Sequence, residues 1–235
     1  MTATSALTGG DLSLQDVWSV AVERAPAADL SDGARERMRA ARGVVESVAH
    51  GSHEHTYGVN TGFGRFVSKQ IPEELTEELQ LRLLRSHACG VGDPYPDAVV
   101  RAAMLLRANA LAKGNSGARV ETVELLLECL NRGVLPFVPS RGSVGASGDL
   151  APLAHLALPL VGEGRAYYDG ELVDGADALS RAGLAPVRLV AKEGLSLING
   201  TQFMAAQGAL ALVRARRLTR VADLACALSL EALQG

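Results

Sequence analysis

Positive charge is not in excess in this sequence of 235 residues, and cysteine is scarce. The 23 Lys and Arg residues are outnumbered by 26 Asp and Glu residues, which gives a net charge of −3. Such a chain offers no basic field to hold phosphates, so nucleic acid is not an expected partner. The three cysteines, Cys89, Cys129 and Cys226, lie far apart, and none belongs to a C-x-x-C pair. This odd, scattered set argues against a disulfide framework and favours a reducing compartment.

Long apolar runs are also missing. No stretch approaches the roughly 18 apolar residues that span a bilayer, and residues 1–5 show neither the basic nor the apolar part of a secretory leader. We therefore expect a cytoplasmic protein with no membrane partner. The composition, 48% hydrophobic and 21% charged, is that of a globular chain long enough to bury a core. Because no linker or repeat is visible, 1–235 is expected to form a single domain.

Helical periodicity dominates the chain. Ser13 followed by Asp16 resembles a capping box and predicts that a helix begins at Leu14. Five further helices are predicted from their first-turn and terminal residues: 31–50, Pro72 to about 90, Pro96 to about 114, Ser116 to about 133, and 201–233. The last would be roughly 50 Å long. A helix of that length needs neighbours to cover its apolar face.

Strand signals are few. The segments 166–168 and 171–173 flank Asp169-Gly170, which is typical of a hairpin with a type I′ turn. The sequence therefore predicts a mainly α fold with one small β-hairpin.

Three glycine-rich segments interrupt the helices. The first reads YGVNTGFG (57–64), the second GSVGASGDLAPL (142–153) and the third KEGLSLINGTQ (192–202). Each could be only a turn, because glycine permits positive φ and close backbone approach. The first segment does not have the spacing of a G-x-G-x-x-G nucleotide loop, and the second lacks the last glycine of G-x-S-x-G. No strand is predicted before either segment, so both of those interpretations fail.

The triplet Ala146-Ser147-Gly148 favours a covalent interpretation. Small residues let the backbone fold tightly enough for the Gly148 nitrogen to attack the Ala146 carbonyl. Loss of water closes a five-membered ring, and loss of the Ser147 hydroxyl leaves an exocyclic methylene. The product is a methylidene-imidazolone, an electrophile that no ordinary side chain supplies. Asp149 onward is predicted to start a helix with Pro152 in its first turn, and that helix N-terminus would favour negative charge on the ring.

These segments resemble the aromatic amino-acid ammonia-lyases and aminomutases, a family that uses this prosthetic group. The resemblance runs from about Leu12 to the end of the chain and covers all three segments in order. Within the family, RSHACGVG (85–92) is similar to the pattern of the enzymes that act on histidine. The resemblance implies a helical fold of the ammonia-lyase and fumarase type. It implies elimination of ammonia from L-histidine to give urocanate, by a self-formed electrophile in place of a metal or nucleotide.

The resemblance also implies roles for individual residues. Tyr57 matches the base that removes the β-proton of the substrate, Asn199 the residue that hydrogen-bonds the ring and helps position the substrate carboxylate, and His87 the residue that contacts the substrate side chain. Each also has a plain interpretation: Tyr57 as a packing aromatic, His87 as a complement to a helix dipole, and Asn199 as a turn residue. Beside an intact Ala-Ser-Gly triplet, the functional interpretation is preferred.

Other polar residues are expected to be structural. His53 and His55 could suggest a metal, but no third ligand is in sight, so no metal is expected. His155 is predicted to be a satisfied buried residue on the helix after the triplet. A solvated or intersubunit face is predicted for four arginines, Arg214, Arg216, Arg217 and Arg220.

The length departs from the family pattern. Members are roughly twice as long, and their second halves supply further site residues that cannot be assigned here. The family also shares its active sites between subunits of a homotetramer built on long helices, so we expect this chain to be the amino-terminal half of such an enzyme. Alternatives are a tyrosine ammonia-lyase, a tyrosine 2,3-aminomutase, or an inactive helical oligomerisation protein.

Overall fold

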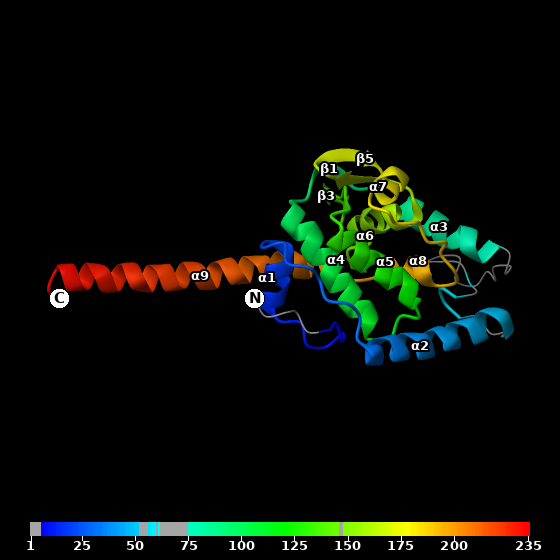
Figure 1. The fold of residues 1–235 in the computed structure, drawn as a ribbon, viewed down its shortest axis with the longest axis horizontal. Coiled ribbons are helices and arrows are strands. Elements are labelled where there is room, and N and C mark those ends of the chain that lie inside the picture. Colours follow the sequence, from blue (N-terminus) through cyan, green and yellow to red (C-terminus); the bar gives the residue numbers. More distant parts are fainter. Residues whose placement is uncertain (1–5, 52–55, 60, 62–74, 146–147) are drawn as a thin grey trace.

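The structure, a computed structural model, describes residues 6–51, 56–59, 61, 75–145 and 148–235. Within them the chain is mainly helical, as the sequence predicts (Figure 1). The helices are α1 (Leu14–Ala21), α2 (Asp32–Gly51), α3 (Thr76–His87), α4 (Asp97–Ala112), α5 (Val120–Asn131), α6 (Leu150–Ala157), the short 3-10 helix η3 (Leu158–Val161), α7 (Gly175–Arg181), α8 (Glu193–Ile198) and α9 (Gln202–Ala232). The strands are β1 (Val91–Pro94), β2 (Leu135–Pro136), β3 (Pro139–Arg141), β4 (Arg165–Tyr168) and β5 (Glu171–Asp174).

Helix α4 lies at the centre of the body. Ten of its 16 residues are buried, as expected for a helix whose apolar residues surround its axis. Helices α1, α2, α5 and α9 all pack against it. The core that they enclose includes Met104, Leu105 and Leu126, none of which is accessible to solvent.

Helix α1 begins as its sequence predicts. The Asp16 amide donates to Ser13 Oγ at 3.2 Å, and the Ser13 amide donates to the Asp16 carboxylate at 2.8 Å, so both halves of the capping box are made. The cap fixes the start of the helix and turns Val17 and Trp18 into the core. Helix α1 then packs against both α4 and α9.

Helix α9 runs for 31 residues and extends away from the body of the molecule (Figure 1). Its first part belongs to the core, where Phe203, Ala206, Leu210 and Val213 are buried. Beyond Val213 its large apolar side chains are exposed: Leu218, Val221, Leu224, Leu228 and Leu230. Apolar surface gathered in this way is typical of a surface that contacts another protein segment.

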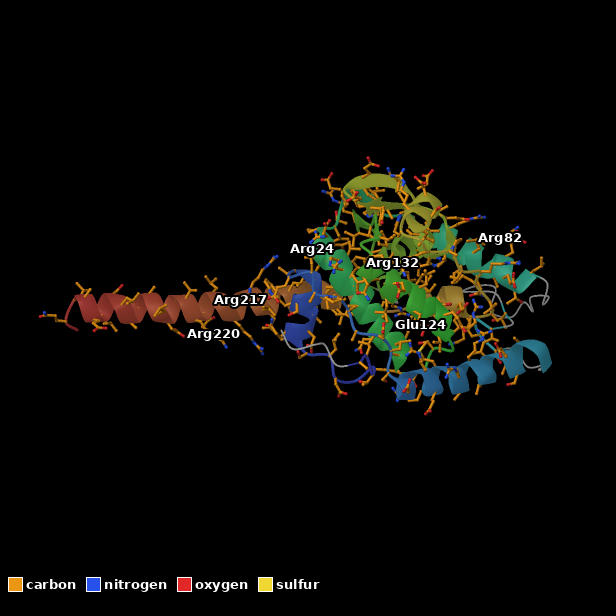
Figure 2. The ribbon with its side chains drawn as sticks, viewed as in Figure 1. Arg24, Arg82, Glu124, Arg132, Arg217 and Arg220 are labelled. Carbon is orange, nitrogen blue, oxygen red and sulfur yellow. The ribbon has the colours of Figure 1, made fainter. Side chains whose placement is uncertain are left out.

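The arginines of α9 are exposed, and one of them ties the helix to the body (Figure 2). The Arg217 guanidinium lies over the Trp18 ring, 4.1 Å from its centroid, and forms a long ion pair of 4.0 Å with Glu23. The cation–π attraction between a guanidinium and an indole ring is favourable even at an exposed site. Arg217 therefore helps to set the angle at which α9 leaves α1.

The predicted hairpin is present and belongs to a slightly larger sheet. Strand β4 pairs antiparallel with β5, and Asp169 and Gly170 between them have φ of 50° and 83°, the two positive values that a type I′ turn requires. Strand β2 pairs with the other edge of β4, and β1 pairs with β3 in a separate sheet. These three strands have only two to four residues and contain proline, so no period-2 pattern could reveal them.

Two of the predicted helix starts, at Ser116 and Pro72, are not confirmed by the structure. Ser116 does not cap the fifth helix, because α5 begins at Val120 with Arg119 as its N-cap. The Ser116 carbonyl instead accepts hydrogen bonds from Lys192 Nζ and Ser196 Oγ. Pro72 lies outside the described residues, so the predicted start of the third helix stays a prediction. No helix in the described part of the chain is long and apolar enough to cross a membrane.

Candidate active site

The second glycine-rich segment leads into α6 through a residue that must be glycine. Gly148 has a φ of +101°, and a Cβ at this position would lie 2.4 Å from the carbonyl oxygen of Gly200. Both the backbone conformation and this close contact exclude a side chain. Ala146 and Ser147 lie outside the described residues. The last residue of the triplet therefore lies directly against the third glycine-rich segment, one residue after Asn199.

Asp149 joins the same two segments by hydrogen bonds. Its amide donates to the Gly200 carbonyl at 2.6 Å, and its carboxylate accepts from the Met204 amide and the Ser143 hydroxyl, each at 2.9 Å. The Met204 amide is in the first turn of α9, where amides have no acceptor within the helix. Asp149 is 3% exposed, so a buried negative charge caps the positive end of the long helix.

Helix α8 has only six residues, and its neighbours hold it by polar contacts to its backbone and first turn. Glu193 is fully buried and accepts from Arg119 and Thr122 at 2.7–3.2 Å. The Gly194 amide donates to Gln80 Oε1 of α3 at 3.0 Å. A Cβ at Gly194 would lie 2.8 Å from the Gln80 carbonyl oxygen, so α3 and α8 approach too closely for any other residue. These contacts hold the start of α8, and Asn199, which is exposed, follows its last residue, Ile198.

Residues 196–202, the α8–α9 corner, enclose a buried cation. Arg107 of α4 is 3% exposed. Its Nη1 donates to the Asn199 carbonyl at 3.2 Å and to Gln202 Oε1 at 2.9 Å, and its Nη2 donates to the Ser196 carbonyl. Among the described residues no carboxylate pairs with it, and its Nε has no partner. Burial lowers the pKa of Arg107 to about 10, which leaves it charged at neutral pH.

His87 ends α3 beside the second segment. Its Nδ1 lies 2.9 Å from the Leu83 carbonyl, which orients the ring at the C-terminus of the helix. The loop that follows is held by His155 of α6, whose Nε2 accepts from the Gly90 amide at 3.0 Å. A Cβ on Gly142 would come within 3.1 Å of the Gly90 Cα. His155 therefore lies on the helix after the triplet and has a hydrogen-bond partner, as predicted, but it is half-buried and not fully buried. It ties the loop after His87 to the second segment.

Tyr57 lies on a turn that is anchored near α8. Val59 is buried in a small cluster with Val45 of α2 and Ala191, which comes just before α8. This contact brings the first segment to the third. Tyr57 itself is 50% exposed. His53 and His55 lie outside the described residues, and the described ones hold no group of metal-ligating side chains.

The structure thus brings the three segments to one region. Helices α3, α6 and α8 pack against one another, and they carry His87, the end of the triplet and Asn199. Sequence reasoning missed Arg107 and the capping role of Asp149. A signal for Arg107 existed, because it is a charged residue among the apolar residues of a helix with a buried core position on nearly every side, a feature that it shares with Arg101. Asp149 gave a weaker one, since an acidic residue before a helix ordinarily caps that same helix.

Comparison with known proteins identifies this architecture. The sequence profile of the family described as aromatic amino acid lyase matches residues 12–235. The chain belongs to the aromatic amino acid lyase family. It is 56% identical over 229 residues to a histidine ammonia-lyase of Gloeobacter violaceus, an alignment that covers 97% of this chain and 44% of the relative.

Solved structures of this lyase family show the same fold. The histidine ammonia-lyase of Trypanosoma cruzi matches 98% of this chain and 44% of its own with a TM-score of 0.90 and 42% identity. The tyrosine aminomutase of Streptomyces globisporus matches 91% of this chain and 40% of its own with a TM-score of 0.83 and 38% identity. The chain spans about half the length of the curated relatives it matches.

Proposed function

We propose that the protein eliminates ammonia from L-histidine to give urocanate, using a methylidene-imidazolone formed from Ala146, Ser147 and Gly148. The observation that carries this proposal is the contact of Gly148, in a backbone conformation reserved for glycine, with the residue after Asn199. The curated relatives support the choice of substrate, since histidine ammonia-lyases are 50–56% identical to this chain.

The residues that surround the triplet fit this prosthetic group. In its formation the Gly148 nitrogen bonds to the Ala146 carbonyl carbon, whose oxygen leaves as water with the amide hydrogens of Ser147 and Gly148. The Ser147 hydroxyl leaves as a second water with its α-hydrogen. A glycine at the attacking position has no Cβ in the way, and Asp149 anchors its neighbour to Gly200. Once formed, the group supplies an electrophilic carbon that captures the substrate amine and makes nitrogen a leaving group.

The other residues act on the substrate. Tyr57 is proposed to remove the β-proton of the substrate as a general base. Asn199 is proposed to bind the ring and the substrate carboxylate. His87 is proposed to contact the imidazole of the substrate.

The exposed part of α9 supports a homotetramer with shared sites. Its leucines and valines form an apolar surface on a helix with no covering element among the described residues. A cytoplasmic location stays our proposal, in keeping with three free cysteines.

The decisive experiment uses protein expressed from its complete gene. Intact mass should be two waters lower than the sequence predicts, and histidine should be converted to urocanate, which is followed by its ultraviolet absorbance. Ser147→Ala should keep the fold, regain the mass of a linear chain and lose on the order of 10³-fold or more in kcat, because no side chain replaces the electrophile.

Two outcomes would redirect the proposal. Coumarate from tyrosine, without urocanate from histidine, would favour the tyrosine lyase. β-Tyrosine as the product would favour the aminomutase, since this chain is similar to the tyrosine aminomutase of Streptomyces globisporus. An unmodified mass and no turnover would favour a helical oligomerisation protein.

A further inference from the structure

Arg107 holds the corner that carries Asn199, although it faces neither solvent nor, among the described residues, any carboxylate. Burying an unpaired charge is costly, and the cost is tolerated where the charge has a task. Here the guanidinium binds carbonyl oxygens at the C-terminal end of α8, the end where helix carbonyls lack partners and the dipole is negative. The cation therefore replaces the hydrogen bonds that the end of α8 would otherwise lack.

The same guanidinium also reaches α9. Gln202 is the first residue of that helix, and its Oε1 accepts from Arg107. A planar fork with several donors can hold three acceptors in fixed directions, which a single ammonium cannot do. Arg107 thus sets the angle between α8 and α9 at the turn formed by Asn199 and Gly200.

This turn is in contact with the prosthetic-group loop. A Cβ on Gly200 would lie 2.3 Å from Arg107 Nη1, and the Gly200 carbonyl in turn touches Gly148 and accepts from the Asp149 amide. An unbroken series of contacts therefore leads from the buried cation to the backbone that must cyclise.

We propose that Arg107 is a positioning residue for the prosthetic-group site: by holding the α8–α9 corner it places Asn199 and presses the backbone of Gly148 into its bent conformation. This inference rests on the proposed function. It assigns Arg107 no contact with the substrate and no part in proton transfer.

Arg101 provides a matched control. It lies on the same helix, is 6% exposed, and likewise donates to two backbone carbonyls, those of Val20 and Leu130. Those carbonyls belong to the ends of α1 and α5, away from the corner. Arg101→Met therefore removes a buried guanidinium of the same kind without touching the site.

The experiment compares wild type, Arg101→Met, Arg107→Met and Arg107→Lys, each expressed from the complete gene. Unfolding, intact mass and the separate values of kcat and KM are measured on the folded fraction. We expect Arg101→Met to lose stability but to keep the loss of two waters and the wild-type kcat. Arg107→Met should contain linear, unmodified chains and lose on the order of 10²-fold in kcat, because a displacement of about 1 Å has that effect. The dehydrated fraction and the kcat of Arg107→Lys should lie between those of wild type and Arg107→Met, since lysine keeps the charge but lacks the planar set of donors of the guanidinium.

Each outcome decides a different question. If Arg107→Met does not fold, Arg107→Lys gives the answer alone. An Arg107→Lys protein that is fully dehydrated, with wild-type kcat, overturns the positioning role while the proposed function stands. A wild type that keeps the mass of its linear sequence overturns the proposed function and this inference with it. A dehydrated wild type that is inactive on histidine removes only the substrate assignment, and the mass comparison still decides the role of Arg107.

Discussion

Replacing Gly194 with alanine adds one methyl group where α8 meets α3. The new Cβ would lie 2.8 Å from the Gln80 carbonyl oxygen and 3.1 Å from Gln80 Oε1. The side-chain amide of Gln80 could swing away, but its carbonyl is part of α3 and could not. A shift of α8 is therefore required, and this shift would weaken the 3.0 Å hydrogen bond from the Gly194 amide to Gln80 Oε1.

Three effects set the size of the change. Alanine is favoured over glycine in a helix by about 1 kcal/mol. Overpacking a closed contact costs about 1–3 kcal/mol, and leaving the buried Gly194 amide without its acceptor costs a further 1–3 kcal/mol or so. Since the two penalties exceed the gain, we expect Gly194→Ala to lower the free energy of unfolding by about 2 kcal/mol.

Gly43 is the matched control. It lies within α2, is exposed, and a Cβ there would meet no atom within 4 Å. Gly43→Ala should therefore raise the free energy of unfolding by up to about 1 kcal/mol. Urea unfolding followed by far-ultraviolet circular dichroism measures both changes. If the two variants shifted in the same direction, the close approach of α3 and α8 would not be a constraint, and the reasoning would be refuted.

Two further predictions concern the residues that connect the segments. Asp149→Ala should lower the free energy of unfolding by about 2 kcal/mol, because the Met204 amide and the Ser143 hydroxyl both lose their buried acceptor; an unchanged urea midpoint would contradict the cap. Burial, with a smaller effect of the Arg165 charge, lowers the pKa of His155 below its ordinary 6.5. The unfolded chain then binds the proton first, so stability should be full above pH 6.5 and decrease as the pH falls towards the lowered pKa. His155→Gln should show less of this decrease in thermal unfolding between pH 7 and 5, and equal slopes would argue against it.

The parts of the fold that follow from local signals were predictable from the sequence. The capping box of Ser13 and Asp16, the Asp169-Gly170 turn and the long apolar periodicity of α9 each depend on neighbouring residues only, and each is confirmed. Strands β1, β2 and β3 were not predictable, because they have two to four residues with no period and, unlike β4 and β5, no hairpin turn marks them. Ser116 was assigned the wrong role, since its contact with α8 is made across the fold.

In the candidate site, too, the features that depend on neighbouring residues were predictable and the contacts made across the fold were not. Its segments were visible in the sequence because they consist of unusual neighbours, above all the small residues before Asp149. What holds them was not visible. Arg107 and Gln80 act on α8 from other helices, and nothing in the local sequence states which backbone a buried side chain will meet. The roles proposed for Tyr57, His87 and Asn199 stay predictions.

Helix α9 has one end bonded to Asp149 and Arg107 and the other far from the body. The core holds this continuous helix as far as Val213, and Arg217 contacts Trp18 just beyond that point. A partner segment that contacts its distal leucines would be held in a fixed direction from the body, because the helix is continuous. We therefore expect the distal half of α9 to lose its helical structure before the body unfolds when no partner covers it.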